Sequence, residues 1–431
     1  MTAEVIILNS SGVALAADSA VTIGGTKIYN TAIKLMALSK TEPVGIMVYG
    51  NAGLMGVPWE TLIKIYRVAL KDKQMDTLED YAEDFLSYLK GRMDLFPPEL
   101  ERQWVGGNVY RLYNRLREQL IKAVEPLMQS GTPVSEEQVA KMLEELIDKQ
   151  HETLGAEPYG LGMDEEFEDK ARSHYSELFK ELLEGVFQNL KPRKAYVTKL
   201  YDIAIYIHTR NVYSRATSGL VFAGYGNKEI YPSVANYEIE GILQGRLKYR
   251  LDESKSKKIT HSRDAAVYPF AQEDMVNLFL NGVNSQILHH MTTALTGFIE
   301  RVPDLIKDED LNTEVRSVAE IKDSLGLSLE AALNSYYQGF GQHIRDVHIT
   351  PVMNMVRVLP KDELAAMAEA LVNLTAFKRK MTNTLETVGG PIDVAVISKG
   401  DGLVWIKRKH YFPPELNATF YKNYFRGIDN D

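Results

Sequence analysis

The chain opens with MTAEVIIL (residues 1–8), a turn at residues 9–12 and GVALAADS (residues 12–19). An apolar run, a turn and a second apolar run predict a β-hairpin. The second run is apolar on both faces, which predicts a buried strand. Two further runs follow, at residues 27–36 and 44–50. These first fifty residues therefore predict a strand-rich core, and the rest of the chain is interpreted around them.

Two charged residues, Asp18 and Lys34, lie among these apolar runs. Burying either charge is costly unless the two pair, so we expect an ion pair. Removal of Met1 would leave Thr2 with a free α-amine, which titrates near roughly pH 8 and can act as the base for its own hydroxyl. Lys34 would lower the pKa of that amine by like-charge repulsion, and Asp18 would hold Lys34. The N–H of Gly50 would serve as the oxyanion donor.

This pattern resembles the β-type subunits of proteasomes and their bacterial relatives, which are N-terminal-nucleophile (Ntn) hydrolases. In that family the mature chain starts with the nucleophilic Thr, an Asp lies sixteen residues later and a Lys a further sixteen on. Thr2, Asp18 and Lys34 have this spacing, and Gly50 matches the oxyanion glycine after a small insertion. Near the C-terminus, GGPIDVAVI (residues 389–397) and DGLVW (401–405) resemble the closing hairpin of the family.

The resemblance also implies where substrate binds. Thr22 falls where the family grips a substrate backbone as an added strand. Five apolar residues fall where the family lines its first specificity pocket, which implies cleavage after apolar residues; plain core packing is the alternative. They are Val21, Ala32, Met36, Val48 and Ala52.

The sequence departs from the family in a second polar set. The family has a Ser in a Gly-Ser-Gly turn, and an Asp and a Ser just before the Gly-Gly pair. Leu385 and Val388 occupy the latter two positions, and residues 266–272 contain no Ser. The candidates to replace these groups are Thr384, Glu386 and Thr387.

Composition limits the function classes. The chain has 431 residues, 45% of them hydrophobic, a net charge of -9 and a pI near 5.6, which argues against nucleic acid or an anionic membrane as partner. It has no Cys, which excludes a Cys nucleophile, disulfides and thiolate metal sites. The histidines lack the spacing of a zinc site, so we expect no metal and no cofactor. Without a signal peptide or an apolar run of about 20 residues, a cytoplasmic protein is expected.

The expected fold class is α+β, and the resemblance implies a four-layer αββα Ntn-hydrolase sandwich with helical insertions. Helices are predicted over 53–70, 78–92, 109–127 and 173–190, with strands at 201–207, 218–226 and 229–232. The acidic cluster at 164–169 is interpreted as a solvated face. The predicted segments are 1–92 (first part of the core), 93–200 (helical insertion), 201–285 (second part of the core), 286–358 (second helical insertion) and 359–431 (closing helix and hairpin).

The sequence thus predicts a threonine-type peptidase or amide hydrolase acting on peptide or protein substrates. The resemblance implies a homo-oligomeric ring or stacked assembly, and an ATP-driven unfoldase as partner. One alternative is a catalytically inactive scaffold or binding protein of the same fold, which the missing Ser and Asp favour. A further alternative is hydrolysis of small-molecule amides by the same Thr2.

Overall fold

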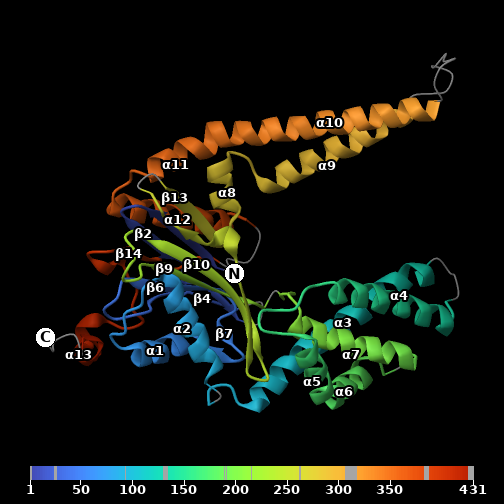
Figure 1. Ribbon diagram of the computed structural model, residues 1–431, viewed down its shortest axis with the longest axis horizontal. Helices are drawn as coiled ribbons and strands as arrows, with labels where there is room; N and C mark the ends of the chain where they lie inside the picture. Colours follow the sequence, from blue (N-terminus) through green and yellow to red (C-terminus); the bar gives the residue numbers. More distant parts are fainter. Residues whose placement is uncertain are drawn as a thin grey trace. The chain divides into compact units, whose positions relative to one another are not determined.

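The computed structural model describes residues 2–23, 27–92, 94–129, 134–188, 190, 192–214, 216–261, 264–305, 318–382 and 388–425 (Figure 1). The chain forms two compact units. Unit 1 comprises Met1–Leu35, Ile230–Pro232 and Lys258–Asp431, and unit 2 comprises Met36–Glu229 and Ser233–Lys257. Each unit contains an antiparallel sheet and helices, which confirms the predicted α+β class.

Unit 1 is built on a five-stranded sheet that the two ends of the chain share. In order across the sheet, its strands are β13 (Ala265–Ala271), β1 (Ala3–Asn9), β2 (Gly12–Ala17), β14 (Asp393–Ser398) and β15 (Gly402–Lys407). All neighbouring strands are antiparallel. The opening hairpin β1–β2 and the closing hairpin β14–β15 are therefore confirmed. A small two-stranded sheet, β3 (Val21–Ile23) and β4 (Lys27–Tyr29), follows β2.

Helix α12 (Lys361–Lys380) packs on one face of this sheet. Side chains alternate along a strand, so Ala3, Val5 and Ile7 of β1 enter the apolar cluster with α12. The cluster also includes residues of α8 (Asp274–Asn281) and α11 (Thr350–Val356). Thr2 and Glu4, at the alternate positions, point to the opposite face of the sheet.

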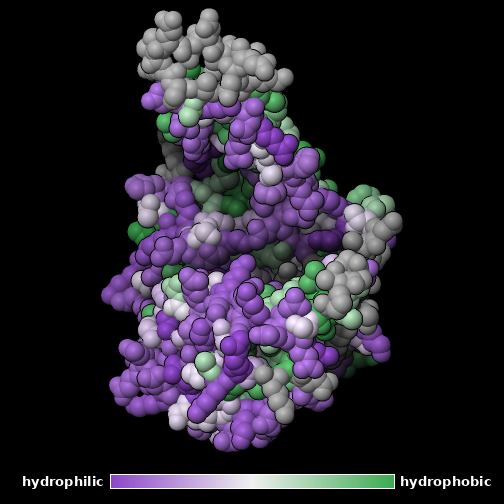
Figure 2. All heavy atoms as spheres, turned by 90° about the vertical axis from the view of Figure 1, so that its right-hand side faces the viewer, coloured by the Kyte–Doolittle hydropathy of each residue, from purple (hydrophilic) through white to green (hydrophobic). Residues whose placement is uncertain are grey.

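Helices α9 (Ser285–Arg301) and α10 (Val318–Ile344) lie side by side in unit 1 (Figure 1). The Tyr337 hydroxyl donates to the Thr292 carbonyl oxygen at 2.9 Å and joins the two helices. Figure 2 shows a face that is mainly hydrophilic, with hydrophobic residues scattered over it. Exposed large apolar residues of the two helices are Ile287, Met291, Phe298, Leu327 and Tyr336.

Unit 2 contains a second antiparallel sheet. Its strands are, in order, β11 (Arg246–Leu251), β10 (Ser233–Leu243), β9 (Ser218–Gly224), β6 (Val44–Gly50) and β5 (Leu35–Ala37), with β12 (Lys257–Lys258) paired to β10. The helix predicted over 53–70 begins only at α1 (Trp59–Leu70), because β7 (Gly53–Leu54) and β8 (Val57–Pro58) form a small ribbon before it. The strand predicted over 229–232 is wrong, since β10 begins at Ser233.

Five further helices of unit 2 surround an apolar core of their own. They are α3 (Pro98–Gln129), α4 (Glu136–Gly155), α5 (Glu165–His174), α6 (Ser176–Val186) and α7 (Lys194–Thr209). The strand predicted over 201–207 is wrong, because this segment belongs to α7. Leu200, Ile203 and Ala204 recur at helical spacing and are buried in that core.

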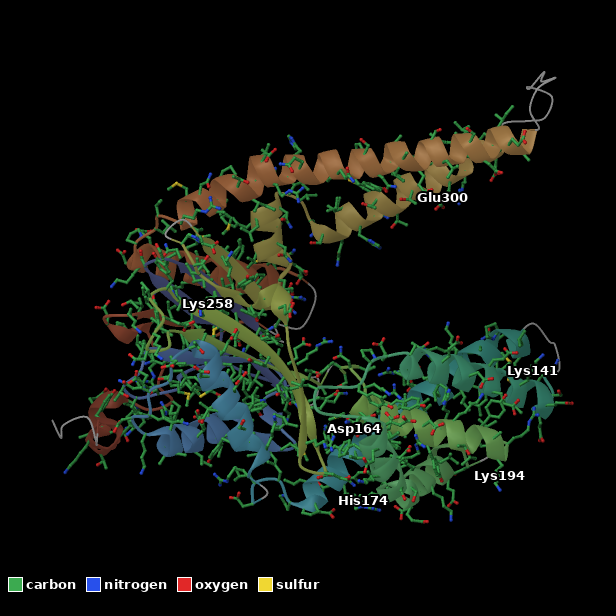
Figure 3. All side chains as sticks on the ribbon, in the orientation of Figure 1. Lys141, Asp164, His174, Lys194, Lys258 and Glu300 are labelled. Carbon is green, nitrogen blue, oxygen red and sulfur yellow. The ribbon has the colours of Figure 1, made fainter. Side chains whose placement is uncertain are left out.

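The acidic cluster at residues 164–169 is only partly a solvated face. Asp164 caps α5 by accepting a hydrogen bond from Phe167 N at 2.8 Å, and Figure 3 shows Asp164 and His174 at the two ends of this helix. Glu168, however, is only 2% exposed and accepts two hydrogen bonds from the Arg210 guanidinium, at 2.9 and 3.0 Å. For Glu168 the solvated interpretation is wrong.

The remaining elements are short, apart from α2 (Leu78–Lys90) on the sheet of unit 2. They are η1 (Glu253–Lys255), η2 (Pro303–Leu305), the π-helical turn η4 (Arg345–Ile349), η5 (Pro414–Leu416) and α13 (Ala418–Phe425). Among the described residues, none of the helices combines the length and apolar character that a membrane span requires.

Helix α2 begins with a reciprocal cap, and its loss gives a first prediction. The Thr77 hydroxyl accepts from Asp80 N at 3.2 Å, and the Asp80 carboxylate accepts from Thr77 N at 2.8 Å. We expect Thr77→Ala to lower the free energy of unfolding by about 1 kcal/mol, because one N–H loses its acceptor. Urea denaturation measures the change. Thr77→Ser keeps the hydroxyl and should stay near wild type; equal losses in both variants would contradict a capping role.

Candidate active site

The Asp18 carboxylate is the centre of the candidate site in unit 1. It follows β2 directly and is 0% exposed. Its Oδ1 accepts from Ala3 N at 3.0 Å and from Lys34 Nζ at 2.5 Å. Its Oδ2 accepts from Gly389 N at 2.9 Å and from Ala20 N at 3.2 Å. Four donors satisfy the buried charge, and the predicted Asp18–Lys34 ion pair is confirmed.

These contacts bring the start of β1 to the ion pair. Asp18 and Ala3 hydrogen-bond in both directions, since Asp18 N also donates to Ala3 O at 3.1 Å. Lys34 Nζ donates to the same Asp18 oxygen, Oδ1, as Ala3 N does. The ammonium therefore lies against the residue that follows Thr2, which is itself 7% exposed. Met1 lies outside the described residues, and the catalytic roles of Thr2, Asp18 and Lys34 stay predictions.

Burial shapes the electrostatics of this cluster. Lys34 is 6% exposed, and burial lowers the pKa of its amine, while the charges of Asp18 and Glu4 act in the opposite direction. Burying an ammonium is costly, and that cost is what lowers its pKa. Its short contact with Asp18 offsets that cost, which is why the pair is found together.

Glu4 is a second carboxyl in the same cluster, and the sequence patterns described above do not single it out. Glu4 is 1% exposed, and neither of its oxygens has a hydrogen-bond partner among the described residues. Burial raises the pKa of Glu4 well above its usual value, an effect that Lys34 opposes and Asp18 reinforces. The signal in the sequence is a single acid inside the apolar run of residues 3–8.

A second ion pair lies across the sheet from Glu4. The pairing registers place Glu4 opposite Ala17, and Ala17 opposite Asp393 of β14. Asp393 is buried and accepts from both Lys409 N and Lys409 Nζ, each at 2.8 Å. Asp393 is thus neutralised by its own lysine, whereas the neighbouring Glu4 is not.

The predicted oxyanion donor, Gly50, ends β6 in unit 2. Its φ is +77°, in the region that favours glycine, and an added Cβ would lie 2.4 Å from the Thr217 carbonyl oxygen. Both the conformation and the close approach of the Thr217 carbonyl oxygen therefore require glycine here. The role of its N–H at an oxyanion stays a prediction.

The predicted substrate-binding residues lie in three segments. Val21 and Thr22 belong to β3, where Val21 is half-buried. Met36 in β5 is 4% exposed, whereas Ala52, just after β6, is exposed. Their roles are untested predictions. The candidate replacements Thr384, Glu386 and Thr387 lie outside the described residues.

No group of three or more His, Asp or Glu residues with metal-site geometry occurs among the residues that the structure describes.

No protein-family model matches the chain, and no curated protein matches it. The solved structures that match include three Anbu proteins. The helical assembly of the Anbu complex from Pseudomonas aeruginosa has 9% sequence identity and a TM-score of 0.32, and the match covers 99% of this chain and 93% of that one. Anbu (ancestral beta-subunit) from Yersinia bercovieri has 10% identity and a TM-score of 0.27 (99% and 94% covered), and an Anbu (Gly-1) mutant from Hyphomicrobium sp. strain MC1 has 9% identity and a TM-score of 0.28 (100% and 98% covered).

These comparisons correct the family named from the sequence. The structures found are described as Anbu, and the matches extend over 99% or more of this chain. The identification of the chain as a divergent proteasome β-type subunit enlarged by helical insertions is therefore wrong. The three solved structures named above are all described as Anbu.

Proposed function

We propose that the chain is an amide hydrolase, of the threonine peptidase type, with Thr2 as its nucleophile once Met1 is removed. The observation that carries the proposal is the shared Asp18 oxygen. It accepts both from the residue after Thr2 and from the buried Lys34 ammonium. A buried lysine held beside the start of a chain is suited to lower the pKa of an α-amine, which favours the free base near neutral pH.

The proposed reaction uses the Thr2 hydroxyl and the Thr2 amine together. Oγ attacks the substrate carbonyl carbon while its proton moves to the α-amine, and the carbonyl electron pair moves to the oxygen. The N–H of Gly50 donates to that oxyanion. The ammonium then gives its proton to the leaving amine, and water hydrolyses the ester on Thr2 by the same route.

The proposed substrate is a peptide that is cleaved after an apolar residue. Val21, Met36 and Ala52 would line the pocket, and Thr22 would bind the substrate backbone. A homo-oligomer and an unfoldase partner belong to the same proposal. The Anbu complex from Pseudomonas aeruginosa forms a helical assembly. The proposal also includes the αββα order of layers, in which the two sheets would form the two central layers.

A second candidate is a catalytically inactive scaffold or binding protein. Val388, directly before the Gly389–Gly390 pair, carries no polar group, and its side chain is buried in the apolar cluster with α12. A site that lacks polar groups around the amine would favour this candidate.

An irreversible probe distinguishes the two candidates. Untagged protein is treated with a peptide epoxyketone, which reacts with both the hydroxyl and the amine of an N-terminal Thr, and its intact mass is measured. We expect loss of Met1 and one adduct, and no adduct in Thr2→Ala, because both reacting groups belong to Thr2. Thr77→Ala, which removes a threonine hydroxyl in unit 2, should keep the adduct. If Met1 is retained and no adduct forms, the hydrolase candidate is excluded and the scaffold candidate is favoured.

A further inference from the structure

We propose that the Glu4 carboxyl is the partner of the Thr2 α-amine: it accepts a hydrogen bond from the ammonium and helps to set the pH at which the nucleophile becomes reactive. This inference rests on the proposed function and deepens it. Glu4 would act through the amine, so it is a positioning residue.

The first observation is that Glu4 is buried without a partner. Both carboxyl oxygens lack a hydrogen bond within the described part of the chain, and the residue is 1% exposed. Buried polar groups in folded proteins are nearly always hydrogen-bonded, so each exception calls for an explanation. A cation created after synthesis, such as the amine released when Met1 is removed, explains why Glu4 has no partner beforehand.

The second observation is the position of Glu4 on β1. Thr2 and Glu4 are two residues apart and point to the face of the sheet opposite α12, since Ala3 and Val5 pack towards α12. Two residues of a strand span about 7 Å. A glutamate side chain that leans towards the start of the strand extends along the same face towards the amine of Thr2.

The third observation is that the neighbouring charges are already paired. Asp18 holds Lys34 at 2.5 Å and accepts three further N–H groups. Asp393 holds Lys409 at 2.8 Å. On β13, Phe270 lies opposite Glu4, and the titratable Tyr268 lies opposite Ile6, one position along on the same face. Both lysines of this cluster are thus engaged by other carboxylates, and the amine of Thr2 would supply a cation for Glu4.

The proposed contact has a defined electrostatic consequence. When Thr2 Oγ attacks, its proton moves to the amine, and the resulting ammonium donates a hydrogen bond to Glu4. Burial raises the pKa of Glu4, so the carboxyl and the amine readily share a proton. A neighbouring carboxylate raises the pKa of the amine, whereas Lys34 lowers it. Removing the Glu4 charge should leave the Lys34 effect opposed only by the Asp18 carboxylate.

The test is the rate of epoxyketone labelling as a function of pH, followed by intact mass. In Glu4→Gln we expect the acid limb of the labelling-rate profile to shift to lower pH by about one unit, because the Thr2 ammonium loses its counter-charge. The maximal rate should also fall, because the amine is less well oriented. Glu4→Leu, which suits an apolar strand, predicts the same shift and covers a failure of the Gln variant to fold. Glu101→Gln makes the same chemical change at a buried carboxyl of unit 2 and should keep the wild-type midpoint.

The outcomes separate the two proposals. A wild-type protein that keeps Met1 or takes no adduct at any pH overturns both the proposed function and the role of Glu4. A labelled wild type whose midpoint is unchanged in folded Glu4→Gln or Glu4→Leu overturns the role of Glu4 alone, since a purely structural residue would change only the amount or the maximal rate of reactive protein.

Discussion

Asp18→Ala is expected to lower the free energy of unfolding by about 3–5 kcal/mol, because it removes one partner of a buried ion pair. The Lys34 ammonium, 6% exposed, would lose the carboxylate that it contacts at 2.5 Å. The N–H groups of Ala3, Ala20 and Gly389 would lose their acceptor in the same step. Urea denaturation followed by circular dichroism at pH 7 measures the loss. Epoxyketone labelling of the folded fraction should fall as well.

Two controls identify the cause of that loss. The double variant Asp18→Ala, Lys34→Met also removes the unpaired Lys34 charge and should recover part of the lost stability. Glu60→Ala breaks the exposed i,i+4 pair with Lys64 on α1, and it should cost less than about 1 kcal/mol. A loss in Asp18→Ala no larger than that in Glu60→Ala would contradict the central role of the Asp18 carboxylate.

The sequence predicted this part of the site because local pattern and charge pairing agree. β1 and β2 are apolar throughout except for Glu4 and Asn9, so the hairpin and its burial follow from residues that are adjacent in the chain. Asp18 and Lys34 are opposite charges in an apolar setting, and pairing is the way to bury both. Glu4 was overlooked because one acid in an apolar run does not reveal which face it occupies, or whether a partner reaches it.

The errors arise where distant residues decide the structure. Residues 201–207 are rich in Ile and Tyr, which favour strands, but packing against α4 and α3 makes the segment part of α7. Glu168 belongs to an acidic run, and only Arg210, forty-two residues later, turns it into a buried ion pair. Contacts of this kind cannot be inferred from local composition.

The buried His208 gives a prediction of similar size in unit 2. It lies in α7 with 0% exposure; Nδ1 contacts the Ala204 carbonyl oxygen at 2.8 Å, and Nε2 contacts the Asn108 amide nitrogen at 3.2 Å. A carbonyl can only accept, so Nδ1 carries the proton and the neutral Nε2 accepts from Asn108. Burial, reinforced by the charge of Lys248, lowers the pKa of His208 to about 4.

The direction of the pH dependence follows from where protons bind. Between pH 6.5 and about 4 the unfolded chain binds a proton at His208 that the folded chain does not, so stability falls as the pH falls through this window. The change in the pKa of His208 from 6.5 in the unfolded chain to about 4 in the folded chain corresponds to about 3 kcal/mol. The stability of wild type relative to His208→Gln should therefore decrease by about 3 kcal/mol between pH 7.5 and pH 4, as measured by urea denaturation. A difference between wild type and His208→Gln that stays constant over this pH range would mean that the buried imidazole is not the group that titrates.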